Sequence, residues 1–195
     1  MGFISHNERN LKLKKIYILL SGTGTFPAKV IRKIKGGKFS HTSLALTPQT
    51  DGFYSYARRR LHNLLVAGFV TENIHTHVFA QYPDAPCALY ALTISDEGYE
   101  KIREMIDYCQ ANYKKAKYNF IGLFALGFGI KIKCKYRYTC SQFVAVLLER
   151  SGDVKLPKDP YLMVPTDFMK IDGIELIYEG ALKDCNFDAD TLTQA

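Results

Sequence analysis

Runs of hydrophobic residues separated by polar turns predict several strands along the chain. Ile16 to Leu20 is a short apolar run that ends at a Ser-Gly-Thr-Gly sequence, and Cys87 to Ile94 is a longer run. Both predict buried strands, and Gly173 to Tyr178 predicts a last one. Ala67 to Thr71 and Thr76 to Ala80 are shorter, and each is predicted as a strand or a loop.

A β-hairpin is predicted around His41. Ser40 to Leu46 and Phe53 to Ala57 are two strand-like runs separated by a polar turn. His41 opens the first arm. Because the beginning of one arm of a hairpin lies beside the end of the other, we expect Ser55 or Tyr56 to approach His41.

Apolar residues at three- and four-residue spacing predict two amphipathic helices. The first is capped by Ser95 or Asp96, and its apolar side extends from Tyr99 to Tyr113. The second runs from Cys140 to Arg150 and ends at Gly152, since glycine commonly follows the last residue of a helix.

Four further segments are patterned less clearly. Ala28 to Lys35 is predicted as a short helix between a proline and a glycine pair. Asn119 to Leu126 is apolar and is predicted to be helical, whereas Ile130 to Tyr138 predicts a strand or an extended arm. The polar end, Asp184 to Ala195, is expected to fray.

Length and composition predict one globular domain. The chain has 195 residues, of which 47% are hydrophobic and 23% are charged, a balance that excludes disordered and fibrous proteins. This length suffices for a single core, which we place at about residues 16–180, and is short for two domains.

The net charge of +7 raises the question of a nucleic-acid partner. The basic residues lie in separate segments, and no nucleic-acid-binding module is recognisable among them. Solvated faces protected by lysine are therefore the favoured interpretation, and nucleic acid is not an expected partner. A basic surface that meets an acidic ligand or a lipid surface stays open as an alternative.

The cysteine pattern and the N-terminal sequence predict a cytoplasmic protein without a transmembrane segment. Five cysteines show neither a CxxC pair nor regular spacing, so neither a zinc site nor a disulfide framework is predicted. The residues before Ile16 are polar, and the run to Leu20 is too short to cross a bilayer. His75 and His77 alternate, yet no carboxylate or cysteine lies at ligand spacing, so we expect no metal or other cofactor.

Cys140 and His41 are candidates for nucleophilic chemistry. A helix N-terminus stabilises a thiolate, and Cys140 lies at a predicted helix start. An imidazole within reach would complete an ion pair, and a third polar group would orient the ring. By position alone each residue is more often structural.

The sequence SHTSLAL with the following FYSYA, taken together with YTCSQFV and the helix-ending Gly152, resembles the NlpC/P60 papain-like superfamily. The order of the two motifs is similar to that of the circularly permuted YiiX/YaeF-like branch, to which the lecithin retinol acyltransferase relatives are more distantly related. In that branch the histidine strand precedes the cysteine helix, as His41 precedes Cys140 here.

The resemblance implies an α+β fold with an antiparallel sheet packed against helices. It further implies a cysteine hydrolase that cleaves an amide bond, in a peptide or an N-acyl amide, through a thioester. Cys140 would be the nucleophile and His41 the general base. The third catalytic position falls at Ser55 or Tyr56, where family members often have histidine, glutamate, aspartate or asparagine.

Two further expectations concern the surroundings of the thiol. The backbone N–H of Cys140 would contribute to an oxyanion hole, and Tyr118 or Tyr138 would assist it or gate the cleft. For both tyrosines a half-buried aromatic with a solvated hydroxyl is the alternative. The alternative function is a catalytically inactive papain-like module that binds a lipid, an acyl group or a peptide.

Overall fold

The computed structural model describes residues 12–22, 37–60 and 63–186. The predicted helix over Ala28 to Lys35 lies outside these residues, as does most of the predicted polar tail. In chain order the strands and helices are β1 (Leu13–Ser21), β2 (His41–Ala45), β3 (Phe53–Arg60), β4 (Asn63–Glu72), α2 (His77–Ala80), β5 (Pro86–Ser95), α3 (Asp96–Ala111), β6 (Lys117–Tyr118), α4 (Phe120–Gly127), β7 (Arg137–Tyr138), α5 (Cys140–Ser151) and β8 (Ile174–Ala181). Short 3-10 helices span Pro160–Leu162, Pro165–Lys170 and Leu182–Asp184.

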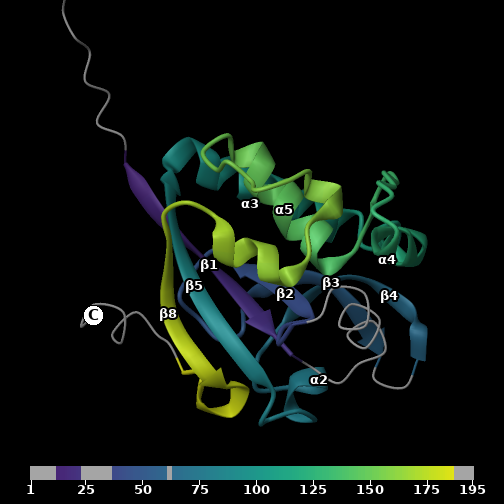
Figure 1. The fold of residues 1–195 in the computed structure, drawn as a ribbon, viewed down its shortest axis with the longest axis horizontal. Helices are drawn as coiled ribbons and strands as arrows, with labels where there is room; N and C mark the ends of the chain where they lie inside the picture. The colour runs from purple at the N-terminus through teal and green to yellow at the C-terminus, as the bar shows by residue number, and fades with distance from the viewer. Residues whose placement is uncertain (1–11, 23–36, 61–62, 187–195) are drawn as a thin grey trace, which may run out of the picture.

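The strands form one sheet in the order β7-β6-β4-β3-β2-β1-β5-β8 (Figure 1). All neighbouring strands are antiparallel except β6 and β7, which are parallel. The predicted hairpin is confirmed, because Leu44 and Ala45 of β2 pair with Tyr54 and Phe53 of β3. The chain therefore has an α+β fold with a mixed sheet.

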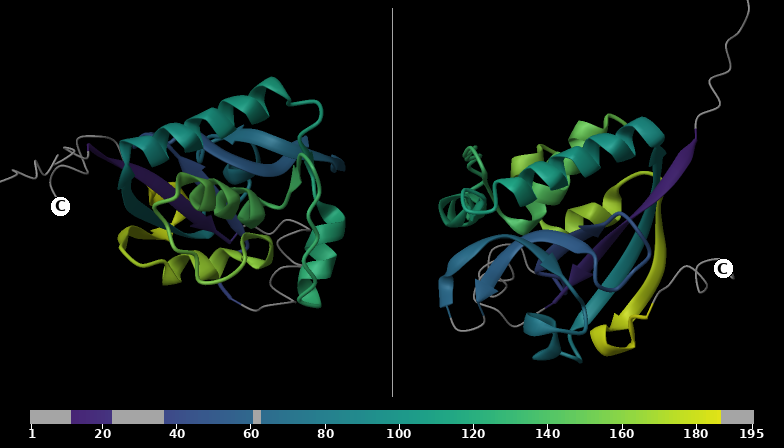
Figure 2. Two further views of the ribbon diagram at one scale, coloured as in Figure 1. Left: turned by 90° about the horizontal axis from the view of Figure 1, so that it is seen from above. Right: turned by 180° about the vertical axis from the view of Figure 1, so that it is seen from behind.

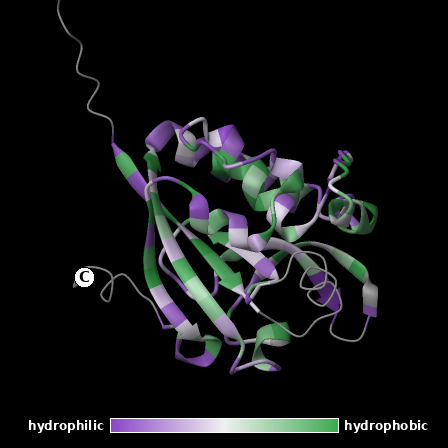
Figure 3. Ribbon diagram, viewed as in Figure 1, coloured by the Kyte–Doolittle hydropathy of each residue, from purple (hydrophilic) through white to green (hydrophobic). Residues whose placement is uncertain are grey.

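Both faces of the sheet are covered, but unequally. Helices α3 and α5 lie over one face, and α2 lies at the other (Figures 1 and 2). Alternate residues of β1 enter the two cores, with Ile18 and Leu20 toward α3 and α5 and Leu19 toward α2. Hydrophobic residues accordingly follow β1 through the middle of the molecule (Figure 3).

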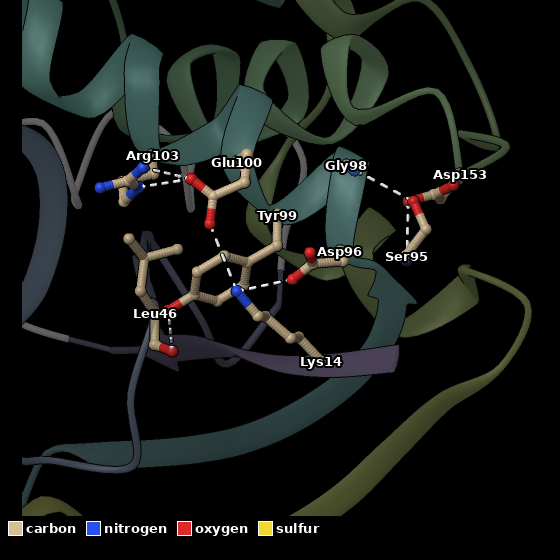
Figure 4. Close-up of polar contacts among 9 residues, drawn as sticks. All are labelled: Lys14, Leu46, Ser95, Asp96, Gly98, Tyr99, Glu100, Arg103 and Asp153. Carbon is tan, nitrogen blue, oxygen red and sulfur yellow. Dashed lines mark hydrogen bonds and ion pairs between the residues drawn. The ribbon is translucent and has the colours of Figure 1, made fainter. Parts of the chain in front are cut away.

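Polar contacts fix the beginning of α3 to its neighbours (Figure 4). The Ser95 hydroxyl accepts a hydrogen bond from the Gly98 N–H at 3.0 Å and donates one to Asp153 at 2.8 Å, which confirms Ser95 as the cap. Lys14 of β1 lies 2.7 Å from Asp96. Such exposed ion pairs stabilise little, so the apolar side of α3 is what holds the helix on the sheet.

Helix α5 begins at Cys140, as predicted. Its first turn is closed by a capping box, in which the Thr139 hydroxyl accepts from the Gln142 N–H and the Gln142 side chain accepts from the Thr139 N–H. The helix ends at Gly152, whose φ of +83° suits the left-handed residue after a helix. Every residue of α5 except Glu149 and Arg150 is buried, so the position of Cys140 is set by core packing.

Several predicted elements differ in extent or type. The run from Ala67 to Thr71 belongs to the longer β4, whereas Thr76 to Ala80 contains the short helix α2 instead of a strand. Over Ile130 to Tyr138, only the last two residues form a strand. A short apolar run fits both the repeat of a helix and the alternation of a strand, so its sequence alone does not distinguish the two.

Candidate active site

The imidazole of His41 is held by a carboxylate. His41 is the first residue of β2 and Glu72 is the last residue of β4. The Nε2 atom of His41 lies 2.9 Å from Oε2 and 3.1 Å from Oε1 of Glu72, and each side chain is 13% exposed. The ring of Phe79 packs near the imidazole, with centroids 6.0 Å apart. This environment restricts the orientation of the imidazole.

The other side of the imidazole faces Cys140. A hydrogen bond links the two side chains. Because Glu72 engages Nε2, Nδ1 is the nitrogen that remains for the sulfur. Cys140 is 2% exposed. A carboxylate, an imidazole and a thiol thus form one hydrogen-bonded chain.

Donors surround the sulfur of Cys140 at the start of α5. The backbone N–H of Thr42 donates to Sγ, and the Ser141 hydroxyl lies 4.0 Å away. The Thr42 and Ser141 hydroxyls are 3.3 Å apart, which ties β2 to the first turn of α5. These donors and the helix start stabilise a negative charge on the sulfur.

Burial and charge oppose each other at the imidazole and the thiol. Burial lowers the pKa of His41, but the Glu72 carboxylate and Cys140 outweigh it and raise that pKa to about 10. Burial raises the pKa of Cys140, but the hydrogen bond and charge of His41 outweigh it and hold that pKa below its ordinary value. Both shifts favour a proton on His41 over one on the Cys140 sulfur, which is the direction that an imidazolium–thiolate pair requires.

Tyr118 is the tyrosine that reaches the thiol. Its buried hydroxyl hydrogen-bonds to both the side chain and the backbone of Cys140. Burial and the Cys140 charge raise the pKa of Tyr118 well above 10, so the hydroxyl stays neutral. Tyr138 pairs with Tyr118 along β6 and β7. Its ring centroid lies 5.4 Å from that of Tyr56 and 6.4 Å from that of Tyr161. The two predicted gating residues thus have different surroundings.

Ser55 and Tyr56 are engaged elsewhere than at the imidazole. The Ser55 hydroxyl donates to the Thr42 carbonyl at 2.7 Å. The Tyr56 hydroxyl lies 3.8 Å from the sulfur of Cys109. The residue that contacts Nε2 of His41 is Glu72, on the next strand, whereas the hydrogen bonds of Ser55 and Tyr56 are made to Thr42 and Cys109.

Two features of the sheet account for the position of Glu72 beside His41 in place of Ser55 or Tyr56. The paired positions of β2 with β3 are Leu44 and Ala45, so the ladder does not extend to His41. In addition, β4 extends past Thr71, where the predicted strand stopped, and ends at Glu72. A glutamate closing an otherwise apolar strand is the signal that was available.

A cavity of about 790 Å³ lies away from the thiol, between α3 and the segment that leads into β7. Its lining includes Tyr108, Lys133, Tyr136 and Arg150, but not Cys140. The candidate site formed by Glu72, His41 and Cys140 is therefore separate from this cavity.

Neither a family model nor a curated protein matches the sequence. Within residues 12–22, 37–60 and 63–186, no group of three or more metal-ligating side chains is found. His77 begins α2, so the alternation with His75 on a strand face is absent. In the same ranges, no helix has the length and apolar character needed to cross a membrane. Function must be inferred from the chemistry of Cys140 and its neighbours.

Proposed function

We propose that the chain is a cysteine hydrolase that cleaves an amide bond, in a peptide or an N-acyl amide, through a thioester on Cys140. The observation that carries the proposal is the position of the His41 imidazole between Glu72 and Cys140. Base and orienting acid have these roles in other cysteine and serine hydrolases. His41 would be the general base and Glu72 its positioning residue.

The pair supports a two-step reaction. The Cys140 thiolate attacks the carbonyl carbon, and the π electrons move to the oxygen. As the tetrahedral intermediate collapses and the C–N bond breaks, the His41 imidazolium donates its proton to the leaving amine. Neutral His41 then takes a proton from water, which attacks the thioester, and the C–S bond breaks to release the acid and the thiolate.

Two donors would bind the oxyanion after giving up the hydrogen bond that they make with each other. The backbone N–H of Cys140 lies at the start of α5, and the Tyr118 hydroxyl is within hydrogen-bonding reach of that residue. Preorganised donors of this kind are a large part of catalysis in acyl transfer. Tyr118 would therefore be a catalytic residue, whereas Tyr138 would support the aromatic packing.

The arrangement also supports membership of the permuted branch of the NlpC/P60 papain-like superfamily. The strand that carries His41 precedes the helix that begins at Cys140, and the sheet packs on that helix. Glu72 supplies a carboxylate of the type that family members use to orient histidine. The family remains a proposal that rests on motif order and these three residues.

A second candidate function is a catalytically inactive module that binds a lipid, an acyl group or a peptide. The near-complete burial of Cys140 favours it, because a substrate would need the residues over the thiol to move. The two functions differ in whether a thioester forms on Cys140.

Alkylation of the cysteines tests the nucleophile. With iodoacetamide near neutral pH and mass-spectrometric readout, we expect Cys140 to react about a hundredfold faster than Cys109, since the thiolate reacts. His41→Ala should remove most of this difference, and His75→Ala, at an exposed position, is the matched control. Equal rates for Cys140 and Cys109 that His41→Ala leaves unchanged would contradict the proposal.

Turnover separates the two functions. N-acyl anilides and short peptides are incubated with the protein, and the acylated mass of Cys140 and the released amine are measured. Hydrolysis that disappears in Cys140→Ala supports the enzyme. A reactive Cys140 that forms no acyl adduct with any of these substrates would favour the binding module.

A further inference from the structure

One segment of the chain carries basic residues without acidic ones. Residues 108–148 contain seven lysines and arginines and no aspartate or glutamate, so this stretch alone accounts for a charge equal to the whole net charge of +7. The remaining chain is neutral on balance. A single-sign region of this size creates a field that attracts an anionic partner.

The same segment also exposes large hydrophobic side chains. Six of the nine exposed large hydrophobics among the described residues lie in it, namely Tyr108, Tyr113, Ile121, Phe124, Phe128 and Ile130. Ile121 is 67% exposed and Phe128 is 84% exposed. Ile121 and Phe124 lie on α4, and Phe128 and Ile130 follow directly after it. This helix stands at one end of the molecule, apart from α3 and α5 (Figure 2), and its residues are largely hydrophobic (Figure 3). Apolar side chains clustered in this way mark an interaction surface.

The chain brings the basic flanks of α4 together. Lys117 precedes the helix and Arg137 follows it, and the two residues are paired in the parallel strands β6 and β7. Lys131 forms an ion pair with Asp159. Lys133 also lies within the electrostatic range of Asp159, and Lys135 hydrogen-bonds to Tyr136. Among the described residues, neither lysine forms an ion pair of its own with a carboxylate. Cations therefore remain available beside the apolar helix.

We propose that α4 and its basic flanks form a docking surface for an anionic lipid membrane. The side chains of Ile121, Phe124 and Phe128 would enter the boundary between headgroups and acyl chains, while the lysines contact the headgroups. Ile121 and Ile130 are each more than half exposed and favour a lipid over a nucleic acid, because aliphatic side chains do not stack on bases as aromatic side chains do. The inference goes beyond the proposed function and uses none of its residues.

Vesicle sedimentation tests the surface. The full chain is mixed with vesicles of phosphatidylcholine alone or of phosphatidylcholine with phosphatidylserine, at low and high salt. We expect binding to the anionic vesicles that weakens with salt. The pairs Phe124→Ser with Phe128→Ser, and Lys133→Glu with Lys135→Glu, should each lower the partition coefficient at least about tenfold.

Matched controls use exposed residues outside the segment. Leu176→Ser on β8, and Lys12→Glu with Lys155→Glu, should leave binding unchanged. Thermal unfolding of each variant checks that the fold is retained. Three outcomes would each overturn the proposal. The protein could fail to bind anionic vesicles, or it could bind both vesicle types equally. It could also bind a single-stranded oligonucleotide more tightly than the vesicles, so that the oligonucleotide displaces it from them. Alkylation of Cys140 is measured in parallel, so an inactive site is distinguishable from an absent membrane surface.

Discussion

Cys140 and Cys109 are both buried on the face of the sheet that α3 and α5 cover, yet their thiols have opposite character. Cys140 is 2% exposed and Cys109 is 5% exposed. Each is in contact with a tyrosine hydroxyl, that of Tyr118 or of Tyr56. The pKa of Cys140 lies below its ordinary value, whereas that of Cys109 lies above it.

The difference comes from the helix end and the neighbouring base. Burial raises the pKa of Cys109, and the Tyr56 hydrogen bond and the Arg150 charge lower it without compensating. Cys109 lies in the last turn of α3, where the helix dipole opposes a negative charge, while Cys140 lies in the first turn of α5. Only Cys140 has His41 beside it. Burial alone therefore does not decide whether a cysteine is a filler or a nucleophile.

Removing the charge of Glu72 should have the largest effect on the difference in thiol pKa between Cys140 and Cys109. Glu72→Gln keeps a hydrogen-bonding group but removes the carboxylate that raises the pKa of His41 to about 10. The His41 pKa should fall, so the alkaline limb of the kcat/KM–pH profile moves to lower pH, and kcat/KM drops about a hundredfold. The same profile for Glu104→Gln, an exposed carboxylate, is the control. An alkaline limb that stays in place would remove Glu72 from the site.

Removing the hydroxyl of Tyr118 should separate thiol reactivity from acyl transfer. Tyr118→Phe takes away one oxyanion donor and leaves the Cys140 N–H, so we expect kcat to fall about tenfold with little change in KM. Alkylation by iodoacetamide creates no oxyanion and should change less than about threefold. Tyr138→Phe is the matched control. Equal losses in kcat and in alkylation would assign Tyr118 to the thiolate instead of the oxyanion.

Removing the hydroxyl of Tyr56 should affect the thiol of Cys109 and not that of Cys140. Tyr56→Phe deletes the contact that lowers the pKa of Cys109, so that thiol becomes less reactive still. The free energy of unfolding in urea should fall by about 1 kcal/mol, because one buried hydrogen bond is lost. Alkylation of Cys140 should not change. A slower Cys140 would indicate that the two cysteines are coupled through the core.

Elements with a strong period were predictable from the sequence. The hairpin of β2 and β3, the Ser95 cap of α3 and the span of α5 up to Gly152 follow from turn residues, helix caps and apolar spacing. These signals are local, because a cap or a turn is determined by residues close to it in the chain. The secondary structure of weakly patterned or short runs, such as the segment containing α2, was not predictable from their own sequence.

The site was predictable only where local signals were enough. The helix start at Cys140 and the hairpin arm of His41 were predicted from local signals, and the resemblance made the two residues candidates. Glu72 depends on how β4 lies relative to β2 across the intervening strand, which no local pattern specifies. The proximity of Tyr118 to Cys140 likewise depends on the position of β6 at the far side of the sheet. Such tertiary neighbours follow from the assembled sheet.

The bond between Thr42 and Ser141 joins positions 99 residues apart, and the bond between His41 and Glu72 joins positions 31 residues apart. Contacts between such distant positions form slowly, because the entropy cost of closing a long loop precedes the stabilising contacts. During folding, Cys140 would therefore behave as an ordinary thiol until α5 has docked on β2. A reactive Cys140 therefore reports that α5 has docked on β2.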